Sequence, residues 1–106
     1  MLKINLKINK NKGIFADGAC EYMKHLREEL RNFGYDVSTG FGSEGGYLNY
    51  YLFAKINDKD TEVLYLRETS QRATIYAFDE TKAPDILNFA VEYLKSLYAF
   101  EVKEAQ

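Results

Sequence analysis

The sequence is poor in the residues that most often report chemistry. It contains one cysteine, one histidine, one proline and no tryptophan among 106 residues. A lone Cys20 excludes an internal disulfide, and the lack of a cysteine or histidine pair predicts no metal site. His25 would lie about 140° around a helix from Cys20, so the two cannot form a nucleophile and base pair within that helix. We therefore predict a non-enzymatic protein with no cofactor, in which Cys20 is a small apolar residue at the edge of the core.

Long apolar runs and a strong excess of one charge are also absent. No stretch approaches the ~20 apolar residues of a membrane span, and the N-terminus alternates instead of forming a signal-peptide core. These absences predict a cytoplasmic protein that does not use a membrane. The net charge of −2 argues against binding duplex nucleic acid through many lysine and arginine contacts.

What is present is typical of a small globular domain. Apolar residues make up 46% of the chain and charged residues 28%, and a chain of this size can bury a core of its own. No repeat, low-complexity run or linker interrupts the sequence. We predict a single domain over residues 1–106.

Hydrophobic periodicity predicts the order of the elements. Residues 2–9 alternate as a half-buried strand, and residues 18–33 follow as a helix with Asp17 as its N-cap and Gly34 at its end. The inward face of that helix is predicted to comprise Ala19, Tyr22, Met23, Leu26, Leu30 and Phe33.

From residue 35 onward the period changes to two. Four strands are predicted, over residues 35–41, 47–56, 62–68 and 72–78. A second helix over residues 82–100 follows, with Thr81 as its N-cap and Pro84 in its first turn. The predicted fold is α+β with the order β-α-β-β-β-β-α, in which two helices pack on one face of an antiparallel sheet.

The strands of this sheet are apolar on both faces, which is unusual for a sheet with one solvated side. The face expected under the helices comprises Leu48, Tyr50, Leu52, Ala54, Ile56, Leu64, Leu66, Ala73, Ile75 and Ala77. The opposite face collects Tyr47, Asn49, Tyr51, Phe53, Val63, Tyr65, Arg67, Thr74, Tyr76 and Phe78. We call this second surface the aromatic face. Its candidate partner-binding residues are Tyr47, Tyr51, Phe53, Tyr65, Arg67, Tyr76 and Phe78.

Three interpretations of the aromatic face remain open at the level of sequence. Tyrosine and arginine are enriched at protein interfaces. Aromatic side chains on a sheet can also stack the bases of single-stranded nucleic acid, here on Tyr47, Tyr51, Tyr65 and Tyr76 with Arg67 and Arg72. The third interpretation is that tyrosine simply favours strands and shields its cross-strand neighbours.

We favour the protein interface and predict an inhibitor or adaptor that binds a protein partner. By analogy of size and composition, we expect a phage- or plasmid-encoded protein that acts against a host defence complex. The second helix has an apolar arc of about 200°, so either the first helix packs beside it or the arc meets another chain. A C2 homodimer is the simplest such assembly. The lysines of the N-terminal arm, Lys3, Lys7, Lys10 and Lys12, are expected to protect a terminal strand from edge-to-edge pairing.

Overall fold

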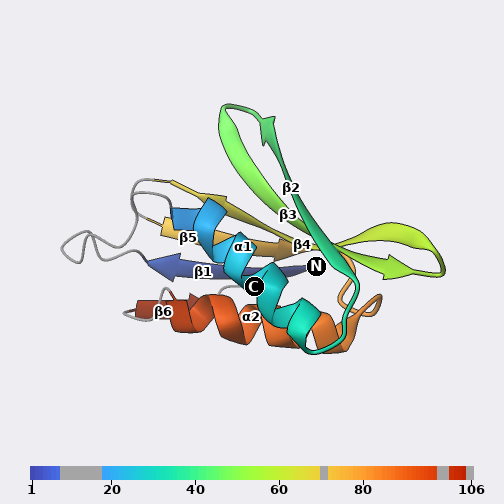
Figure 1. The fold of residues 1–106 in the computed structure, drawn as a ribbon. Coiled ribbons are helices and arrows are strands. Elements are labelled where there is room, and N and C mark those ends of the chain that lie inside the picture. Colours follow the sequence, from blue (N-terminus) through green and yellow to red (C-terminus); the bar gives the residue numbers. More distant parts are fainter. Residues whose placement is uncertain (8–17, 70–71, 98–100, 105–106) are drawn as a thin grey trace.

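The computed structural model describes residues 1–7, 18–69, 72–97 and 101–104. Its six strands form one antiparallel sheet in the spatial order β2-β3-β4-β5-β1-β6 (Figure 1). The strands are β1 (Leu2–Lys7), β2 (Val37–Glu44), β3 (Tyr47–Ile56), β4 (Lys59–Glu68), β5 (Arg72–Ala77) and β6 (Glu101–Glu104), and the helices are α1 (Gly18–Asn32) and α2 (Pro84–Leu97). The predicted α+β class and the order β-α-β-β-β-β-α are confirmed. The short strand β6 was not predicted.

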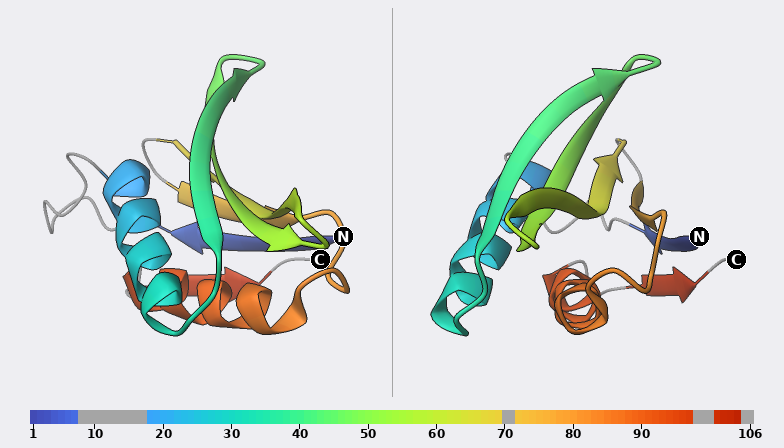
Figure 2. Two further views of the ribbon diagram at one scale, coloured as in Figure 1. Left: turned by 45° about the vertical axis from the view of Figure 1, so that its right-hand side comes forward. Right: turned by 90° about the vertical axis from the view of Figure 1, so that its right-hand side faces the viewer.

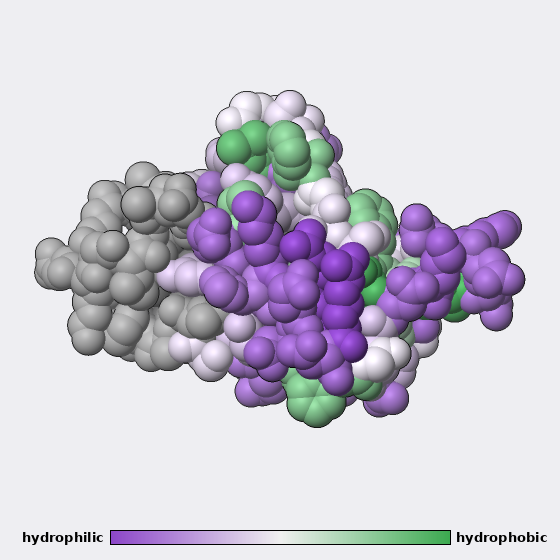
Figure 3. Space-filling view, viewed as in Figure 1, coloured by the Kyte–Doolittle hydropathy of each residue, from purple (hydrophilic) through white to green (hydrophobic). Residues whose placement is uncertain are grey.

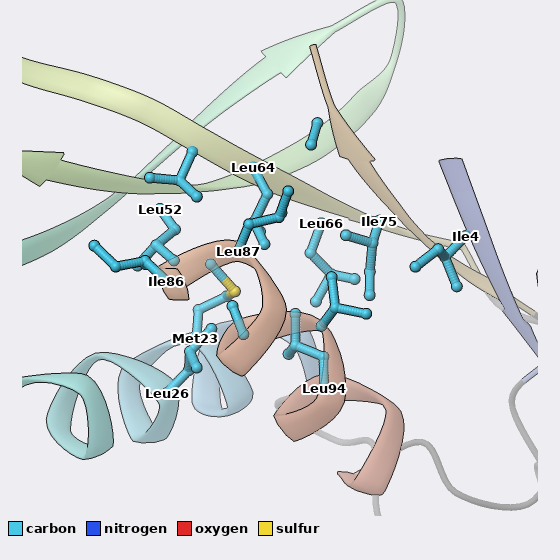
Figure 4. Packing of buried hydrophobic residues seen from close by; sticks show 14 of the residues in the cluster. Ile4, Met23, Leu26, Leu52, Leu64, Leu66, Ile75, Ile86, Leu87 and Leu94 are labelled. Carbon is cyan, nitrogen blue, oxygen red and sulfur yellow. The ribbon is translucent and has the colours of Figure 1, made fainter. Parts of the chain in front are cut away.

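Both helices lie on the same side of the sheet (Figure 2). The core is made by side chains of the strands and of both helices. Leucine and isoleucine side chains from β3, β4 and β5 belong to one buried cluster with Met23 and Leu26 of α1 (Figure 4). From α2, Ile86, Leu87 and Leu94 complete this layer. Because one face of the sheet supplies these side chains, the alternating residues of the same strands point to the other face. None of the helices that the structure describes is long and apolar enough to cross a membrane.

Helix α1 ends as predicted at a glycine. Gly34 has a φ of +92°, a left-handed conformation that glycine adopts without a steric penalty. The backbone N–H of Gly34 donates to the carbonyl of Arg31 at 2.9 Å, and the N–H of Tyr35 donates to the carbonyl of Leu30 at 3.1 Å. The predicted cap Asp17 lies outside the described residues.

Helix α2 begins at Pro84, so the prediction that Thr81 caps it is wrong. Thr81 donates both its backbone N–H (2.9 Å) and its hydroxyl (2.6 Å) to the carboxylate of Asp79. These hydrogen bonds form a turn ahead of the helix and lower the pKa of Asp79. Proline suits the first helical position because it lacks a backbone N–H that would have no partner there.

Part of the wide apolar arc of α2 is covered within the chain. Helix α1 packs beside α2, and the ring of Phe33 meets Phe89 edge-on at 5.1 Å. Tyr93 stacks on Phe89 at 6.3 Å. Phe33 itself is 67% exposed, so its predicted place in the core is wrong. Phe33 follows the last residue of α1, and its ring contacts Phe89 of α2 at the surface of the helix pair.

A β-bulge displaces one residue that alternation assigned to the aromatic face. Leu52 pairs with Leu64, whereas the next residue, Phe53, pairs with Glu62, so Val63 is an extra residue in β4. Val63 is 4% exposed and joins the core, and its predicted position on the aromatic face is wrong. A strict two-residue period holds only while the register is constant.

Strand β4 also begins at Lys59, three residues before the predicted start. Asn57 and Asp58 both adopt left-handed φ values of 52° and 65°. This conformation makes a two-residue turn between β3 and β4, so that Lys59 pairs directly with Ile56.

The hairpin of β2 and β3 projects beyond the helices (Figure 2). Leu48, predicted to lie under the helices, is therefore 50% exposed, and Phe41 is exposed as well. Apolar side chains gather at this projecting end (Figure 3). The predicted burial of Leu48 is wrong because the sheet extends further than the helices that cover it.

Strand β1 lies inside the sheet, between β5 and β6. The interpretation that its lysines protect an exposed sheet edge is therefore wrong. Instead, Lys3 pairs with Tyr76 and Lys7 pairs with Arg72 in the register of β1 with β5. Lys10 and Lys12 lie outside the described residues.

Candidate functional site

The centre of the aromatic face is a row of tyrosines that crosses three strands. Tyr51, Tyr65 and Tyr76 lie opposite one another on β3, β4 and β5. The ring centroids of Tyr51 and Tyr65 are 5.4 Å apart, and those of Tyr65 and Tyr76 are 4.8 Å apart with an interplanar angle of 22°. Phe53 stacks on Tyr51 at 6.0 Å, and Phe78 lies 5.9 Å from Tyr65. We call these five residues the aromatic ladder.

The two remaining predicted site residues join the ladder at one side. The guanidinium carbon of Arg67 lies 4.9 Å from the ring centroid of Tyr47, 5.8 Å from that of Tyr65 and 5.7 Å from that of Tyr76. Such distances allow cation–π attraction, which favours a guanidinium held over a ring. All seven residues that the sequence indicated are thus on one face of the sheet.

Asn49 holds this arrangement together. Its side chain is completely buried, accepts a hydrogen bond from Nε of Arg67 at 2.8 Å and donates one from Nδ2 to the hydroxyl of Tyr51 at 3.1 Å. Glu44 adds a charge pair with Arg67, at 3.8 Å between the carboxylate and a terminal guanidinium nitrogen. Neither Asn49 nor Glu44 was among the predicted site residues. For Asn49, the only indication in the sequence was a single asparagine within a strand rich in aromatic residues.

A row of polar residues runs beside the tyrosines. Asn49, Arg67, Thr74 and Asn5 lie opposite one another on β3, β4, β5 and β1. The hydroxyl of Thr74 donates to Oδ1 of Asn5 at 3.1 Å, and Thr74 is almost fully buried. The aromatic face is therefore apolar toward one end of the strands and polar toward the other.

Two glycines of β2 make room for the ladder at the sheet edge. Gly40 lies opposite Tyr51 and Gly42 lies opposite Asn49. A Cβ atom on Gly40 would come within 3.3 Å of the Phe53 ring, and one on Gly42 within 3.5 Å of the Tyr51 ring. The rings therefore lean over backbone that carries no side chain.

None of the elements that the structure describes lies over the aromatic face, because both helices pack on the other side and β1 lies within the sheet. The rings cover one another instead. Tyr65, in the middle, is only 8% exposed, whereas Phe78 at one end is 63% exposed. Burial raises the pKa of Tyr65, and Arg67 opposes that shift to a smaller extent. Tyr65 therefore keeps its proton at neutral pH, and its hydroxyl can donate a hydrogen bond.

Glu62, opposite Phe53 at the bulge, is a second group whose titration responds to the fold. Burial raises the pKa of Glu62, and Lys82 only partly offsets this. A raised folded-state pKa means that the protonated acid stabilises the fold below the unfolded pKa of 4.5. That contribution is lost as the pH rises through the folded-state pKa.

Replacing Glu62 by glutamine should therefore raise the melting temperature at pH 7 and leave it nearly unchanged at about pH 3, where the native side chain is already neutral. Thermal denaturation followed by circular dichroism at both pH values measures this difference. The matched control is Glu29→Gln on α1, an exposed glutamate whose replacement should change stability by less than about 0.5 kcal/mol at either pH. An equal gain at both pH values for Glu62→Gln would exclude the carboxylate charge as its cause.

Comparison with known proteins adds no second view of the site. No family model, curated protein or solved structure matches this chain. Among the described residues, no three histidine, cysteine, aspartate or glutamate side chains gather where they could hold a metal ion. Cys20 is exposed on α1, on the helix side of the sheet. The function of the aromatic face is therefore inferred from its own geometry.

Proposed function

We propose that this chain is a non-enzymatic protein-binding domain, an inhibitor or adaptor, that docks on a protein partner through the aromatic face. The observation that supports this proposal is the aromatic ladder, in which rings pack on one another across a sheet face that none of the described elements covers. Contiguous exposed aromatic surface is characteristic of interaction sites, and tyrosine and arginine are the residues that most often anchor protein complexes.

The arrangement of the rings favours a protein over nucleic acid as the ligand. A base stacks on a ring only where the face of that ring is open. Tyr65 has Tyr51 on one side and Tyr76 on the other, so the central tyrosine offers little open ring face. The ladder thus presents ring edges and hydroxyl groups, which suit the mixed apolar and hydrogen-bonding contacts of a protein interface.

The protein partner could be a second copy of this chain. Phe41 and Leu48, both exposed on the projecting hairpin, are a second apolar surface that a C2 dimer would cover. The C-terminal helix is a weaker candidate for docking, because α1 already covers part of its apolar arc. We also propose a cytoplasmic location, a phage or plasmid origin and a host defence complex as the partner. These three points rest on the sequence alone.

Affinity capture from native extract, with mass-spectrometric identification, tests the proposal. We expect a protein partner that is captured with and without nuclease treatment and is lost when Tyr47 and Phe78 are both replaced by alanine. These two rings are among the most exposed of the face, so their removal should disturb the fold little. The matched control is Phe33→Ala, which removes a ring at least as exposed from the helix side and should leave capture unchanged.

Sedimentation equilibrium of the purified chain at micromolar concentration separates self-association from foreign partners. A dimer that dissociates in the Tyr47 and Phe78 double variant would identify the second copy as the occupant of the face. Capture that survives in the double variant, or that disappears with nuclease, would contradict docking of a protein on the aromatic face.

A further inference from the structure

The polar end of the aromatic face contains a pocket with a volume of about 230 Å³. Three of the lining residues that the structure describes are cations, namely Lys3, Arg67 and Arg72, and none of these described lining residues is acidic. Glu44 approaches Arg67 from outside the lining, at 3.8 Å, with a side chain that is 75% exposed. A concave site with several cations raises the local concentration of anions.

The pocket is built by the register of the sheet. Lys3 lies opposite Tyr76 with its ammonium nitrogen 5.7 Å from the ring centroid, and Asn5 lies opposite Thr74. At the end of β4, the backbone N–H of Thr69 donates to the carbonyl of Arg72 at 2.8 Å, and the backbone N–H of Arg72 donates to the hydroxyl of Thr69 at 3.3 Å. Strand pairing therefore brings residues that are almost 70 positions apart in the sequence to one pocket wall.

The size and charge of the pocket limit what it can hold. Pockets for drug-sized ligands measure about 300 to 1,000 Å³, so this one suits a single small group. Glu44 offsets part of the charge on Arg67, which leaves a balance close to +2 among the described residues at the pocket. A carboxylate carries −1, whereas a phosphate monoester carries about −1.5 to −2 at neutral pH and three acceptor oxygens. Arginine, lysine and hydroxyl groups together are the usual donors to such oxygens.

We propose that this pocket binds the phosphate group of a small phosphate monoester, with Lys3, Arg67 and Arg72 as its cationic ligands. The polar lining of Asn5 and Thr74 supplies amide and hydroxyl groups beside them. Tyr47 and Tyr76 form the aromatic walls and would contact the organic group esterified to the phosphate, which projects from a pocket of this size. The proposal goes beyond the docking of a protein, because the ligand is a small molecule and Asn5, Arg72 and Lys3 lie outside the predicted docking residues.

Titration of the full chain with three probes, followed by backbone amide NMR, tests this site. Adenosine 5′-monophosphate and inorganic phosphate should give saturable shifts at Asn5, Thr74 and Tyr76, whereas adenosine without phosphate should not. Arg72→Gln and Lys3→Gln should each weaken phosphate binding about tenfold or more, as expected for loss of a charge-assisted hydrogen bond. Arg72→Lys should restore most of the affinity, because it keeps the charge. The matched control is Lys24→Gln, the same charge change on exposed α1, which should leave binding unchanged.

Several results would overturn the assignment. These are a lack of saturation at about 10 mM phosphate, where even weak anion sites fill, or binding that Arg72→Gln does not affect. Acetate that binds as well as phosphate would make the pocket a carboxylate site instead. An oligonucleotide that binds about a hundredfold more tightly than the mononucleotide would assign the cations to a nucleic-acid strand. Loss of partner capture leaves this titration unaffected, so failure of the docking proposal and failure of the phosphate site can be told apart.

Discussion

Replacing Asn49 by alanine should destabilise the protein by about 2 to 3 kcal/mol, because its removal takes away the acceptor of the Arg67 Nε–H and the donor to the Tyr51 hydroxyl. Asn49 is fully buried, and its carbonyl oxygen is the acceptor for Nε of Arg67. Its amide also donates to the hydroxyl of Tyr51. Removing the acceptor of a partly buried guanidinium costs more stability than removing the acceptor of a neutral donor, because a desolvated charge then has fewer hydrogen bonds. Urea denaturation followed by circular dichroism measures the loss.

The matched control for Asn49 is Asn88→Ala on α2. Asn88 is exposed, so the same substitution there should change stability by less than about 0.5 kcal/mol. A double-mutant cycle with Arg67→Met then isolates the pair, and we expect a coupling of about 1 kcal/mol or more between Asn49 and Arg67. Additive losses would contradict the idea that Asn49 organises the face through Arg67.

Local patterns were enough to predict most of the fold. Strand β3 spans Tyr47–Ile56 as its alternation predicted, and Gly34 ends α1 because its position requires a left-handed backbone. The errors fall where the structure of a segment depends on residues that are distant in the sequence. The bulge turns Val63 into the core because it interrupts the two-residue period of β4. The prediction from alternation assumed that this period continues along the whole strand. The short strand β6 is defined by its pairing with β1, which local periodicity does not encode.

The membership of the aromatic face was predictable, but its chemistry was not. A period of two places Tyr51, Tyr65 and Tyr76 on one side of any meander. Which ring stacks on which depends on the register between strands, and that register follows from turn lengths and the bulge. Lys3 lies on the aromatic face only because β1 pairs with β5, a strand that is distant from it in the sequence. The phosphate pocket could therefore not be recognised from the sequence.

Replacing Tyr51 or Tyr76 by alanine should each weaken the complex with the captured protein partner by about 2 kcal/mol, or about thirtyfold in Kd. Both side chains are half-buried on the ladder, so a partner can cover what remains open of each ring. Salt should change these affinities little, since the lost contacts are apolar and hydrogen-bonding. Tyr65 is unsuitable for this test, because truncation of a buried aromatic side chain costs the fold itself about 3 kcal/mol or more.

The same variants separate the protein partner from a nucleic-acid strand. Fluorescence anisotropy with labelled single-stranded oligonucleotides at two salt concentrations should show no binding tighter than about 0.1 mM, the level of nonspecific contact. Tyr93→Ala on α2 is the matched control, since Tyr93 is also half-buried but lies on the helix side and should leave the complex intact. Tyr51 lies outside the lining of the phosphate pocket, but its hydroxyl accepts a hydrogen bond from buried Asn49, so circular dichroism must first show that Tyr51→Ala is folded. Submicromolar oligonucleotide binding that falls steeply with salt and disappears in Tyr51→Ala would replace the protein interface with base stacking as the function of this face, because only stacking needs both that ring and the nearby cations.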